Sequence, residues 1–317
     1  MALFGFVNRL LMHAKEATIS SKVFNRRLTE STCKLNTPNR YEAKNKSFLM
    51  EETQEHLSKR FDGVEISKAY VDCRPRYPST IFQTVLNFVN TSSTKEDSAS
   101  KKDSLAVDIG CGPGLMSTAY LAPYFDRVLG VDVSESQIEQ ASLNNKHTNI
   151  EYRVSKAESL PVENNSVTLI QAAAALHWLD HERFYKECDR VLVPGGVIAA
   201  FCYTVEGHSV IDHSKATEMT EVLTEIRKKV TSAENIYYIP RQKLVKERYT
   251  DPCIQIPYTD RERVDTEYMT IATTVSGLFR FYKSLSHVKP FIESCNETLS
   301  GGMPAFKGIV VFSLFSL

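Results

Sequence analysis

Short apolar runs alternate with longer segments of helical periodicity through the middle of the chain, between Leu105 and Tyr203. Runs rich in Val, Ile, Leu and Ala predict strands at residues 105–109, 128–131, 150–154, 167–172 and 197–202. Apolar residues spaced three or four positions apart predict helices over residues 115–122, 135–145 and 182–193. Strands that alternate with helices favour a parallel, doubly wound α/β sheet. Such sheets bind ligands at the carboxyl ends of their strands, where the strand order reverses.

Changes in this pattern divide the rest of the chain. A helical period at residues 79–89 ends an N-terminal helical segment, 48–90, and the polar stretch 91–104 predicts a linker. After Tyr203 the residues up to 290 are polar and interrupted, with helical character at 214–230 and 268–284. Apolar, β-branched residues predict a strand in the region 291–317. We therefore expect one domain over residues 48–317, built around a core at 105–203.

Charge is balanced over the whole chain but not along it. The 38 Lys and Arg equal the 38 Asp and Glu, and a neutral chain argues against dominant binding to nucleic-acid phosphates. Residues 1–47, however, hold nine basic and three acidic residues, which leaves 29 basic and 35 acidic residues in the remainder. A basic leader rich in Ser and Thr, with an apolar helical face near its start, suits a mitochondrial transit peptide. The alternative is a disordered or loosely docked extension of a cytoplasmic protein, and we expect a cytoplasmic monomer or weak homodimer.

The cysteines indicate neither a metal site nor a disulfide framework. There are seven, an odd number, and no CxxC or CxxH pair occurs, so we expect no metal ion and a reducing compartment. No stretch approaches the roughly 18 uninterrupted apolar residues that a membrane-spanning helix needs.

A glycine-rich turn follows the first predicted strand and carries the strongest local signal. Gly110, Gly112 and Gly114 let the backbone turn tightly and approach a ligand that a Cβ would block. A nicotinamide or flavin enzyme would need its third glycine three positions after Gly112, where this chain has Leu115. Asp132 ends the next strand and can accept both hydroxyls of a ribose. Asp108, at the end of the first strand, could hold an ammonium, so an aminoacyl-adenosine satisfies both acids better than a dinucleotide.

Four successive segments carry a family resemblance: VDIGCGPG, GVDVSESQI, AESLPVENNSV and RVLVPGG. In this order they resemble the motifs of the class I S-adenosylmethionine-dependent methyltransferases, over about residues 61–203. The pairs Phe61-Asp62 and Ala69-Tyr70, the run Arg74–Pro78 and the run Ala175–Asp180 are similar to the trans-aconitate methyltransferase-like group. The resemblance implies a Rossmann-like fold with a mostly parallel seven-stranded sheet. It also implies that residues 48–90 form a lid and that 204–290 form a helical cap that selects the acceptor.

The resemblance also implies a cofactor, S-adenosyl-L-methionine, and assigns residues to it. Gly110, Cys111, Gly112 and Gly114 would form the loop around the methionine portion, with Asp108 near its amino group. Asp132 would bind the ribose and Val133 would lie against the adenine. The remaining assignments follow the chain: Ala157 and Glu158 at the adenine edge, and Ala173, within the run 172–174, beside the sulfonium. Many relatives have an acid immediately before the Ala-Glu pair, whereas this chain has Lys156.

Methyl transfer from a sulfonium is an in-line displacement that mainly requires alignment and exclusion of water. A carboxylate acceptor is already nucleophilic at neutral pH, whereas a phenol, thiol or hydroxyl needs a base, for which His177 is the candidate. The alternative is that His177 and Trp178 only shape the wall of the pocket. In the lid, Arg74 or Arg76 could pair with a carboxylate of the substrate or of methionine. Tyr70 is a similarly placed candidate.

Three functions remain open from the sequence. The first is a methyltransferase that acts on a small-molecule acceptor, a carboxylate or another oxygen. The second is a methyltransferase of quinone precursors, which a mitochondrial leader would favour. The third is a non-catalytic protein that binds S-adenosylmethionine, for which Lys156 and the unusual C-terminal region are the reasons.

Overall fold

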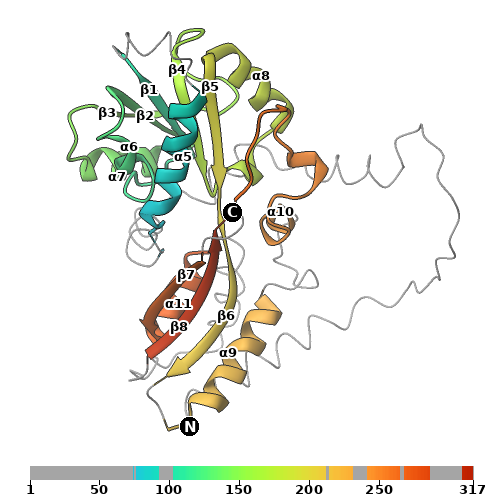
Figure 1. Ribbon diagram of the computed structural model, residues 1–317. Helices are drawn as coiled ribbons and strands as arrows, with labels where there is room; N and C mark the ends of the chain where they lie inside the picture. The colour runs from blue at the N-terminus through green and yellow to red at the C-terminus, as the bar shows by residue number, and fades with distance from the viewer. Residues whose placement is uncertain are drawn as a thin grey trace, which may run out of the picture.

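The computed structural model describes residues 74, 76–92, 103–211, 214–230, 241–264, 268–285 and 309–316. These residues form a five-stranded and a three-stranded sheet with helices packed against them (Figure 1). The predicted leader, most of the predicted lid and Tyr70 lie outside the described residues.

The first sheet has the predicted parallel strands, in the order β3-β2-β1-β4-β5. Their bounds are Leu105–Ile109 for β1, Arg127–Asp132 for β2, Ile150–Val154 for β3, Val167–Ala173 for β4 and Leu192–Phe201 for β5. The strand order reverses between β1 and β4, so the carboxyl ends of these two strands flank the crevice in which such sheets bind ligands. The predicted ranges are confirmed closely for four strands. β5 starts earlier than predicted, because Leu192 pairs with Val167 ahead of a shift in register.

Helices cover both faces of this sheet. The helix α5 (Ser79–Ser92) packs with α6 (Thr118–Leu121) on one face, where Val89 and Leu121 share a core with Ala106. The helix α8 (His181–Val191) covers the other face, where Phe184 and Cys188 pack with Val107. Since successive residues of a strand point to opposite faces, β1 is apolar at nearly every position. The fourth helix of this region, α7, spans Glu135–Asn144 and follows β2.

The predicted helix 115–122 is wrong at its start, since α6 begins at Thr118. The residues before it form turns, and the buried side chains of Ser117 and Thr118 donate to the carboxylate of Asp108. Hydroxyl groups that bond locally in this way compete with helical structure.

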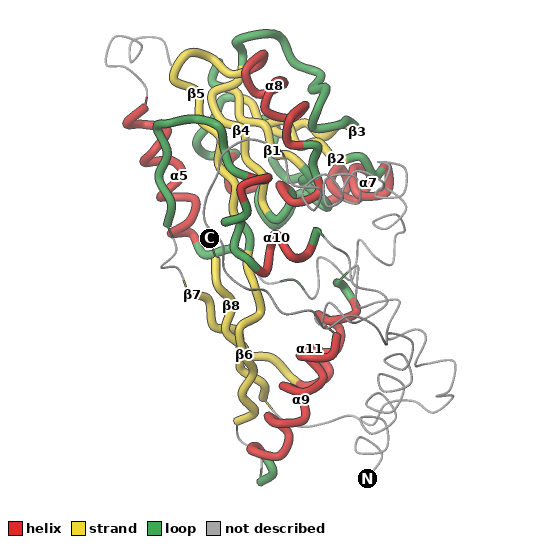
Figure 2. Tube along the Cα trace, turned by 90° about the vertical axis from the view of Figure 1, so that its right-hand side faces the viewer, coloured by secondary structure: helices red, strands yellow, loops and turns green. Residues whose placement is uncertain are grey.

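The second sheet is antiparallel, in the order β6-β8-β7. Its strands are β6 (Tyr203–Ile211), β7 (Tyr268–Thr274) and β8 (Ile309–Ser316), and β6 follows β5 after the single residue Cys202. Figures 1 and 2 show this sheet extending away from the first one, with α9 and α11 alongside. The helices and short turns of this region are α9 (Ala216–Val230), α10 (Gln242–Lys246), α11 (Val275–Lys283) and the 3-10 turn η3 (Pro252–Ile254).

The sequence predictions for this second region hold in part. The helix at 214–230 is confirmed by α9, and a terminal strand is confirmed by β8. The helix predicted at 268–284 is wrong over its first half, where β7 pairs with β8. One sheet of seven strands and a wholly helical cap are not confirmed, since the described residues form sheets of five and three strands.

Candidate active site

The glycine turn lies at the carboxyl end of β1 and has the backbone that its sequence predicts. Gly110, Gly112 and Gly114 all have positive φ, of 61°, 52° and 77°, which disfavours any other residue. A Cβ on Gly110 would lie 2.8 Å from the Cβ of Ala175, just beyond β4. A Cβ on Gly112 would meet only the Oε1 of Gln137, at 3.8 Å, so space remains beside the middle glycine. The turn therefore leaves an open cradle of backbone.

Asp132 joins this turn to the next helix. One carboxylate oxygen accepts a hydrogen bond from the N–H of Gly112 at 3.0 Å, and the other accepts one from the N–H of Ser134 at 3.0 Å. Ser134 in turn caps the N-terminus of α7. The side chain of Asp132 is half-buried at the end of β2, and Val133 follows it at the same edge. A carboxylate fixed by two backbone donors suits a polar ligand that lies across this edge.

Asp108 lies beneath the turn and is fully buried. Its Oδ2 accepts from the hydroxyls of Ser117 and Thr118 at 2.7 and 2.6 Å, and its Oδ1 accepts from Nε2 of Gln171 at 3.2 Å. Burial raises the pKa of this carboxyl above its usual range, although the three donors oppose the shift. These contacts anchor the turn to α6 and β4.

Cys111 is buried within the turn, and its N–H donates to the carbonyl of Val131 at 3.0 Å. Burial raises the pKa of its thiol well above the usual range, so the sulfur is neutral at physiological pH. Cys111 therefore joins the turn to β2 through its backbone N–H, and its thiol is packed in the interior.

Tyr152 supports the turn and was missed by the sequence analysis. It lies opposite Gly130 in the pairing of β3 with β2, and its hydroxyl contacts the carbonyl of Gly114 at 3.5 Å. A Cβ on Gly130 would lie 2.6 Å from the tyrosine ring, and a Cβ on Gly114 would collide with the phenol oxygen. The signal that could have found it was a glycine inside an apolar strand, which often marks a close approach.

The loop between β3 and β4 carries the next pair of candidates. Ala157 is buried, whereas the preceding Lys156 is exposed. Glu158 is half-buried, and its Oε1 accepts from the N–H of Asp180 at 3.0 Å, at the start of α8. The carboxylate of Glu158 thus bonds the loop to a helix that follows β4.

His177 lies in the 3-10 turn η2 (Leu176–Trp178) that follows β4 and is 4% exposed. Its Nδ1 shares a hydrogen bond with the hydroxyl of Tyr249 at 2.9 Å, and its carbonyl accepts from Arg241 at 3.1 Å. Burial raises the pKa of Tyr249 well above its usual range. Tyr249 and Arg241 come from the segment around α10, and no motif in the sequence pointed to either. Ala173, the candidate for the sulfonium, is the last residue of β4.

Arg74 lies with the second sheet rather than with the glycine turn. Its guanidinium donates to the hydroxyl of Tyr203 and to the carbonyl of Ser284, each at 2.9 Å, and lies 5.7 Å from the ring centre of Phe281. Arg76 is exposed. Arg74 therefore joins the start of β6 to the end of α11.

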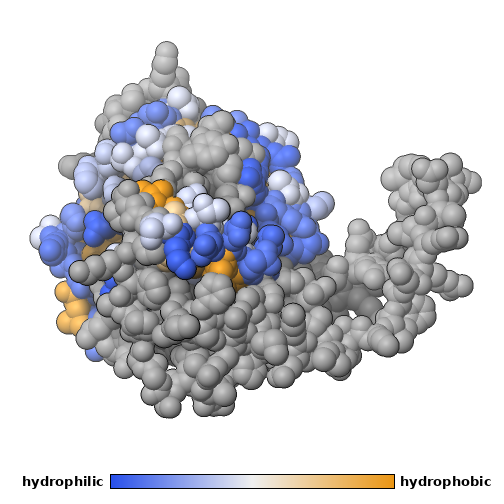
Figure 3. All heavy atoms as spheres, turned by 90° about the horizontal axis from the view of Figure 1, so that it is seen from below, coloured by the Kyte–Doolittle hydropathy of each residue, from blue (hydrophilic) through white to orange (hydrophobic). Residues whose placement is uncertain are grey.

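The cofactor candidates thus meet at one edge of the sheet, where β1, β2 and β4 end. A cavity of about 860 Å³ lies elsewhere, along β5 between α5 and residues 254–264, and the glycine turn does not line it. Among the described residues, no three His, Cys, Asp or Glu side chains group in a way that could hold a metal ion. The described helices include none that is long and apolar enough to cross a membrane. Seen from below, the described surface is mainly hydrophilic, with small separate apolar patches (Figure 3).

Comparison with known proteins agrees with the resemblance. Residues 107–200 match the family described as "Methyltransferase domain". A protein of Dictyostelium discoideum named as a methyltransferase is 29% identical over 232 residues, which cover 73% of this chain and 79% of that protein. A Saccharomyces cerevisiae protein named as an S-adenosylmethionine-dependent methyltransferase is 28% identical over 153 residues, 47% of each chain. The ubiquinone biosynthesis O-methyltransferase of Coxiella burnetii is 32% identical over 136 residues, 38% of this chain and 58% of that one.

The chain therefore spans about half the length of the yeast relative but most of the Dictyostelium one. Together with the parallel sheet and the glycine turn, the match over 107–200 supports an S-adenosylmethionine-dependent methyltransferase.

Proposed function

We propose that this methyltransferase acts on a small molecule and methylates an oxygen, with a carboxylate as the preferred acceptor. The contact between His177 and Tyr249 carries this proposal. His177 is the base candidate of the sequence analysis, yet it is buried and its Nδ1 is hydrogen-bonded to a tyrosine. A carboxylate is ionised at neutral pH and needs no base, so it suits a site in which this histidine has a structural contact.

The residues at the carboxyl edge of the first sheet fit S-adenosylmethionine. The three glycines have positive φ, and the space beside the middle one, Gly112, is open and would be filled by a side chain. The carboxylate of Asp132 lies beside it and accepts from the N–H of Gly112. When bound, the cofactor supplies an activated methyl group on a sulfonium. In this proposal Asp132 binds the ribose, the glycines of the turn line the methionine portion, and Ala157 and Glu158 lie at the adenine.

This chain's own residues would contribute alignment more than proton transfer. Asp132 already has two backbone donors in place, so its orientation does not have to be established when a ligand binds. Ala173 ends β4 and Ala174 follows it, both with small side chains. Ala174 has φ of 54°, and its N–H donates to the carbonyl of Phe201 at 2.7 Å. Small, fixed residues at this point leave room for donor and acceptor to approach in line.

The test is a methylation assay with labelled S-adenosylmethionine on matched panels of carboxylic acids and phenols. We expect faster transfer to carboxylic acids, at a rate that is flat above about pH 5, where carboxylates are ionised. Faster transfer to phenols, with a rate that rises towards a phenol pKa of about 10, would contradict the carboxylate proposal. A His177→Gln variant separates the two cases further, since it should retain carboxylate methylation and would lose phenol methylation if His177 were the base.

Two finer alternatives stay within the proposal. Similarity to the trans-aconitate methyltransferase-like group supports carboxylic acids, whereas the match to a ubiquinone biosynthesis O-methyltransferase supports a quinone precursor. A non-catalytic cofactor-binding protein remains the rival, and binding of cofactor without transfer to either panel would favour it. For residues 1–47 we propose a role in localisation only, cytoplasmic or mitochondrial, which imaging of the tagged chain with and without them would decide.

We also propose that the two sheets act as one sheet of seven strands. β6 continues β5 after Cys202, and β8 pairs antiparallel with β6 while β7 pairs with β8. If β5 and β6 are counted as one strand across Cys202, the order of the seven strands is β3-β2-β1-β4-β5/β6-β8-β7. The cavity along β5 supports a closer association, since the edge of β5 would accept a strand there. Hydrogen exchange at Val197–Ala200 tests it: slow exchange at every amide supports pairing on both edges, and alternate fast amides contradict it.

A further inference from the structure

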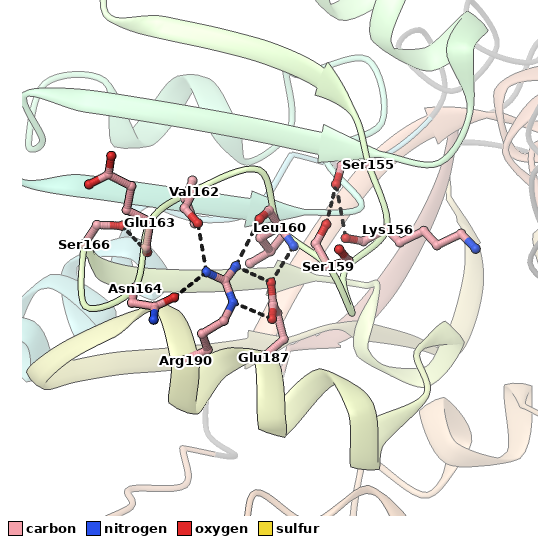
Figure 4. Close-up of polar contacts among 10 residues, drawn as sticks. All are labelled: Ser155, Lys156, Ser159, Leu160, Val162, Glu163, Asn164, Ser166, Glu187 and Arg190. Carbon is pink, nitrogen blue, oxygen red and sulfur yellow. Dashed lines mark hydrogen bonds and ion pairs between the residues drawn. The ribbon is translucent and has the colours of Figure 1, made fainter.

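The loop between β3 and β4 is held at both ends by a single helix, α8. This loop, residues 155–166, carries Ala157 and Glu158, the candidates for the adenine. Nothing in the resemblance gives a role to the side chains of α8. Figure 4 shows the loop folded against this helix, with the side chains of Glu187 and Arg190 pointing into it.

Arg190 forms the larger anchor, which we call the Glu187–Arg190 clamp. Its Nη1 donates to the carbonyl of Val162 at 3.0 Å and to Oδ1 of Asn164 at 2.8 Å, and its Nη2 donates to the carbonyl of Leu160 at 3.1 Å (Figure 4). Three loop acceptors at one guanidinium require a planar fork of donors, which lysine does not have.

Glu187 completes the clamp from the preceding turn of the helix. Its Oε1 accepts from the N–H of Leu160 at 2.6 Å, and its two oxygens pair with Arg190 at 2.6 and 2.9 Å (Figure 4). Glu187 is 9% exposed, and the hydrogen bonds from Arg190 lower the pKa of its carboxyl. Leu160 therefore has both its N–H and its carbonyl bound by α8.

The second anchor lies at the opposite end of the helix. Oε1 of Glu158 accepts from the N–H of Asp180, and Asp180 is the residue whose side chain caps the N-terminus of α8. The loop is thus attached before the first turn of α8 through Glu158 and near its last turn through the clamp. Its backbone cannot shift along the helix unless one of the two anchors breaks.

We propose that Glu187 and Arg190 are positioning residues for cofactor binding: the clamp holds Ala157 and Glu158 where they meet the adenine, without touching the ligand. This inference rests on the proposed placement of the adenine at Ala157 and Glu158. Charge-assisted hydrogen bonds to several backbone carbonyls are among the stronger polar contacts in proteins, so their loss should let the loop move.

The test compares Arg190→Lys and Glu187→Gln with two matched controls. Glu182→Gln and Arg153→Lys make the same chemical changes at exposed ion pairs. Binding of S-adenosylhomocysteine and of adenosine is measured by calorimetry, and thermal unfolding is followed in parallel. Kinetics give the KM for S-adenosylmethionine and for the acceptor separately.

We expect Arg190→Lys to lower the affinity for S-adenosylhomocysteine by about tenfold, which corresponds to the loss of one charge-assisted hydrogen bond. The affinity for adenosine should fall by the same factor, because the loop acts on the adenine alone. The KM for the acceptor should stay unchanged. Glu187→Gln should show the same pattern with a smaller loss of affinity. If Arg190→Lys does not fold, Glu187→Gln alone tests the inference. Both controls should bind as the unmodified chain does.

Two results would overturn the inference. Unchanged affinity together with a lower unfolding temperature would make the clamp purely structural, and a loss seen with S-adenosylhomocysteine but not with adenosine would place its effect elsewhere. Failure of the proposed function is distinguishable, since the unmodified chain would then bind S-adenosylhomocysteine and transfer no methyl group to either panel.

Discussion

The two sheets of the molecule are stabilised in different ways. In the first, carboxylates near strand ends bond the turn and the start of the helix that follow β1: Asp132 with Gly112, and Asp108 with Ser117 and Thr118. In the second, the contacts join residues far apart in the sequence, such as Arg74 with Ser284. The pairing of His177 with Tyr249 joins the two regions.

This difference separates the tasks of the two regions. The first region contains every cofactor candidate, and its contacts do not depend on the second. Among the described residues, the segment around α10 contacts the site through Tyr249 and Arg241, which both bond His177. Variants in the first region should therefore change cofactor binding, and variants in the second should change stability or acceptor use while cofactor binding persists.

The largest expected effect is on Asp132, at the centre of the first region. Asp132→Ala removes the ribose ligand and the acceptor for the N–H groups of Gly112 and Ser134. We expect S-adenosylhomocysteine to bind about 100-fold more weakly, since charged hydrogen bonds contribute about 1.5–3 kcal/mol each. Calorimetry measures this. Unchanged affinity in a folded variant would refute the ribose assignment.

Gly130→Ala should produce the next largest effect, through packing. The new Cβ would lie 2.6 Å from the ring of Tyr152. Overpacking of this kind costs about 1–3 kcal/mol of unfolding free energy, and the shifted tyrosine should disturb the glycine turn. Urea denaturation measures the loss. In a Tyr152→Val background the same substitution should cost much less, and an equal loss in both backgrounds would exclude Tyr152 as the cause.

Arg74→Met probes the second region. It removes the donors to Tyr203 and Ser284, and we expect a loss of about 1–2 kcal/mol in unfolding free energy. Calorimetry should show unchanged binding of S-adenosylhomocysteine. Arg76→Met provides the comparison, because Arg76 is exposed and its loss should leave stability unchanged. If Arg74→Met abolished cofactor binding, the separation of the two regions would be wrong.

Tyr249→Phe breaks the contact that joins the regions. Removal of the hydroxyl leaves Nδ1 of the buried His177 without this hydrogen bond, at a cost of about 1 kcal/mol in unfolding free energy. Thermal unfolding measures the loss, and cofactor affinity should not change. Carboxylate methylation should persist at a similar kcat in Tyr249→Phe, as it should in His177→Gln. A fall in kcat of the same size in both variants would show that the pair acts in catalysis.

The smallest effect on unfolding free energy is expected for Asp108→Asn, and the direction of its dependence on pH can be stated. Burial raises the pKa of Asp108, so folding takes up a proton between the unfolded value of 3.8 and the higher folded value. The contribution of Asp108 to the unfolding free energy is therefore most favourable below pH 3.8, and it is lost as the pH rises through the pKa of the folded state. The asparagine variant should lack this slope in denaturation curves taken at several pH values. Cofactor affinity should change little, whereas a large loss would support direct contact of Asp108 with the ammonium.

The same division describes what could be predicted from the sequence. Strands β1 and β3 match their predicted bounds, β1 as a largely apolar, buried run and β3 as a short segment in which apolar and charged residues alternate. The three glycines and Asp132 were found because backbone approach and a strand-end carboxylate leave local signals. Residues 268–274 were predicted as helix because their apolar spacing fits either element, and only the pairing with β8 makes them a strand.

The partners across long distances left no such signal. Tyr249 and Arg241 are ordinary residues in a polar segment, and their importance comes from contacts with His177 some 70 positions earlier. Arg74 was one of two arginines that could pair with a carboxylate, and in the structure its guanidinium contacts Tyr203 and Ser284. A side chain's charge can be read from a sequence, but the group that it meets depends on the completed fold.

The pairing of β6 also has a consequence for synthesis. Every residue of the first sheet has been made once Phe201 emerges, but β6 pairs with β8, which starts at Ile309. At about 5–20 residues per second, the ribosome leaves β6 without this partner for several seconds or longer. During that interval its edge is open to other strands, so nascent chains should depend on chaperones more strongly than the finished protein does.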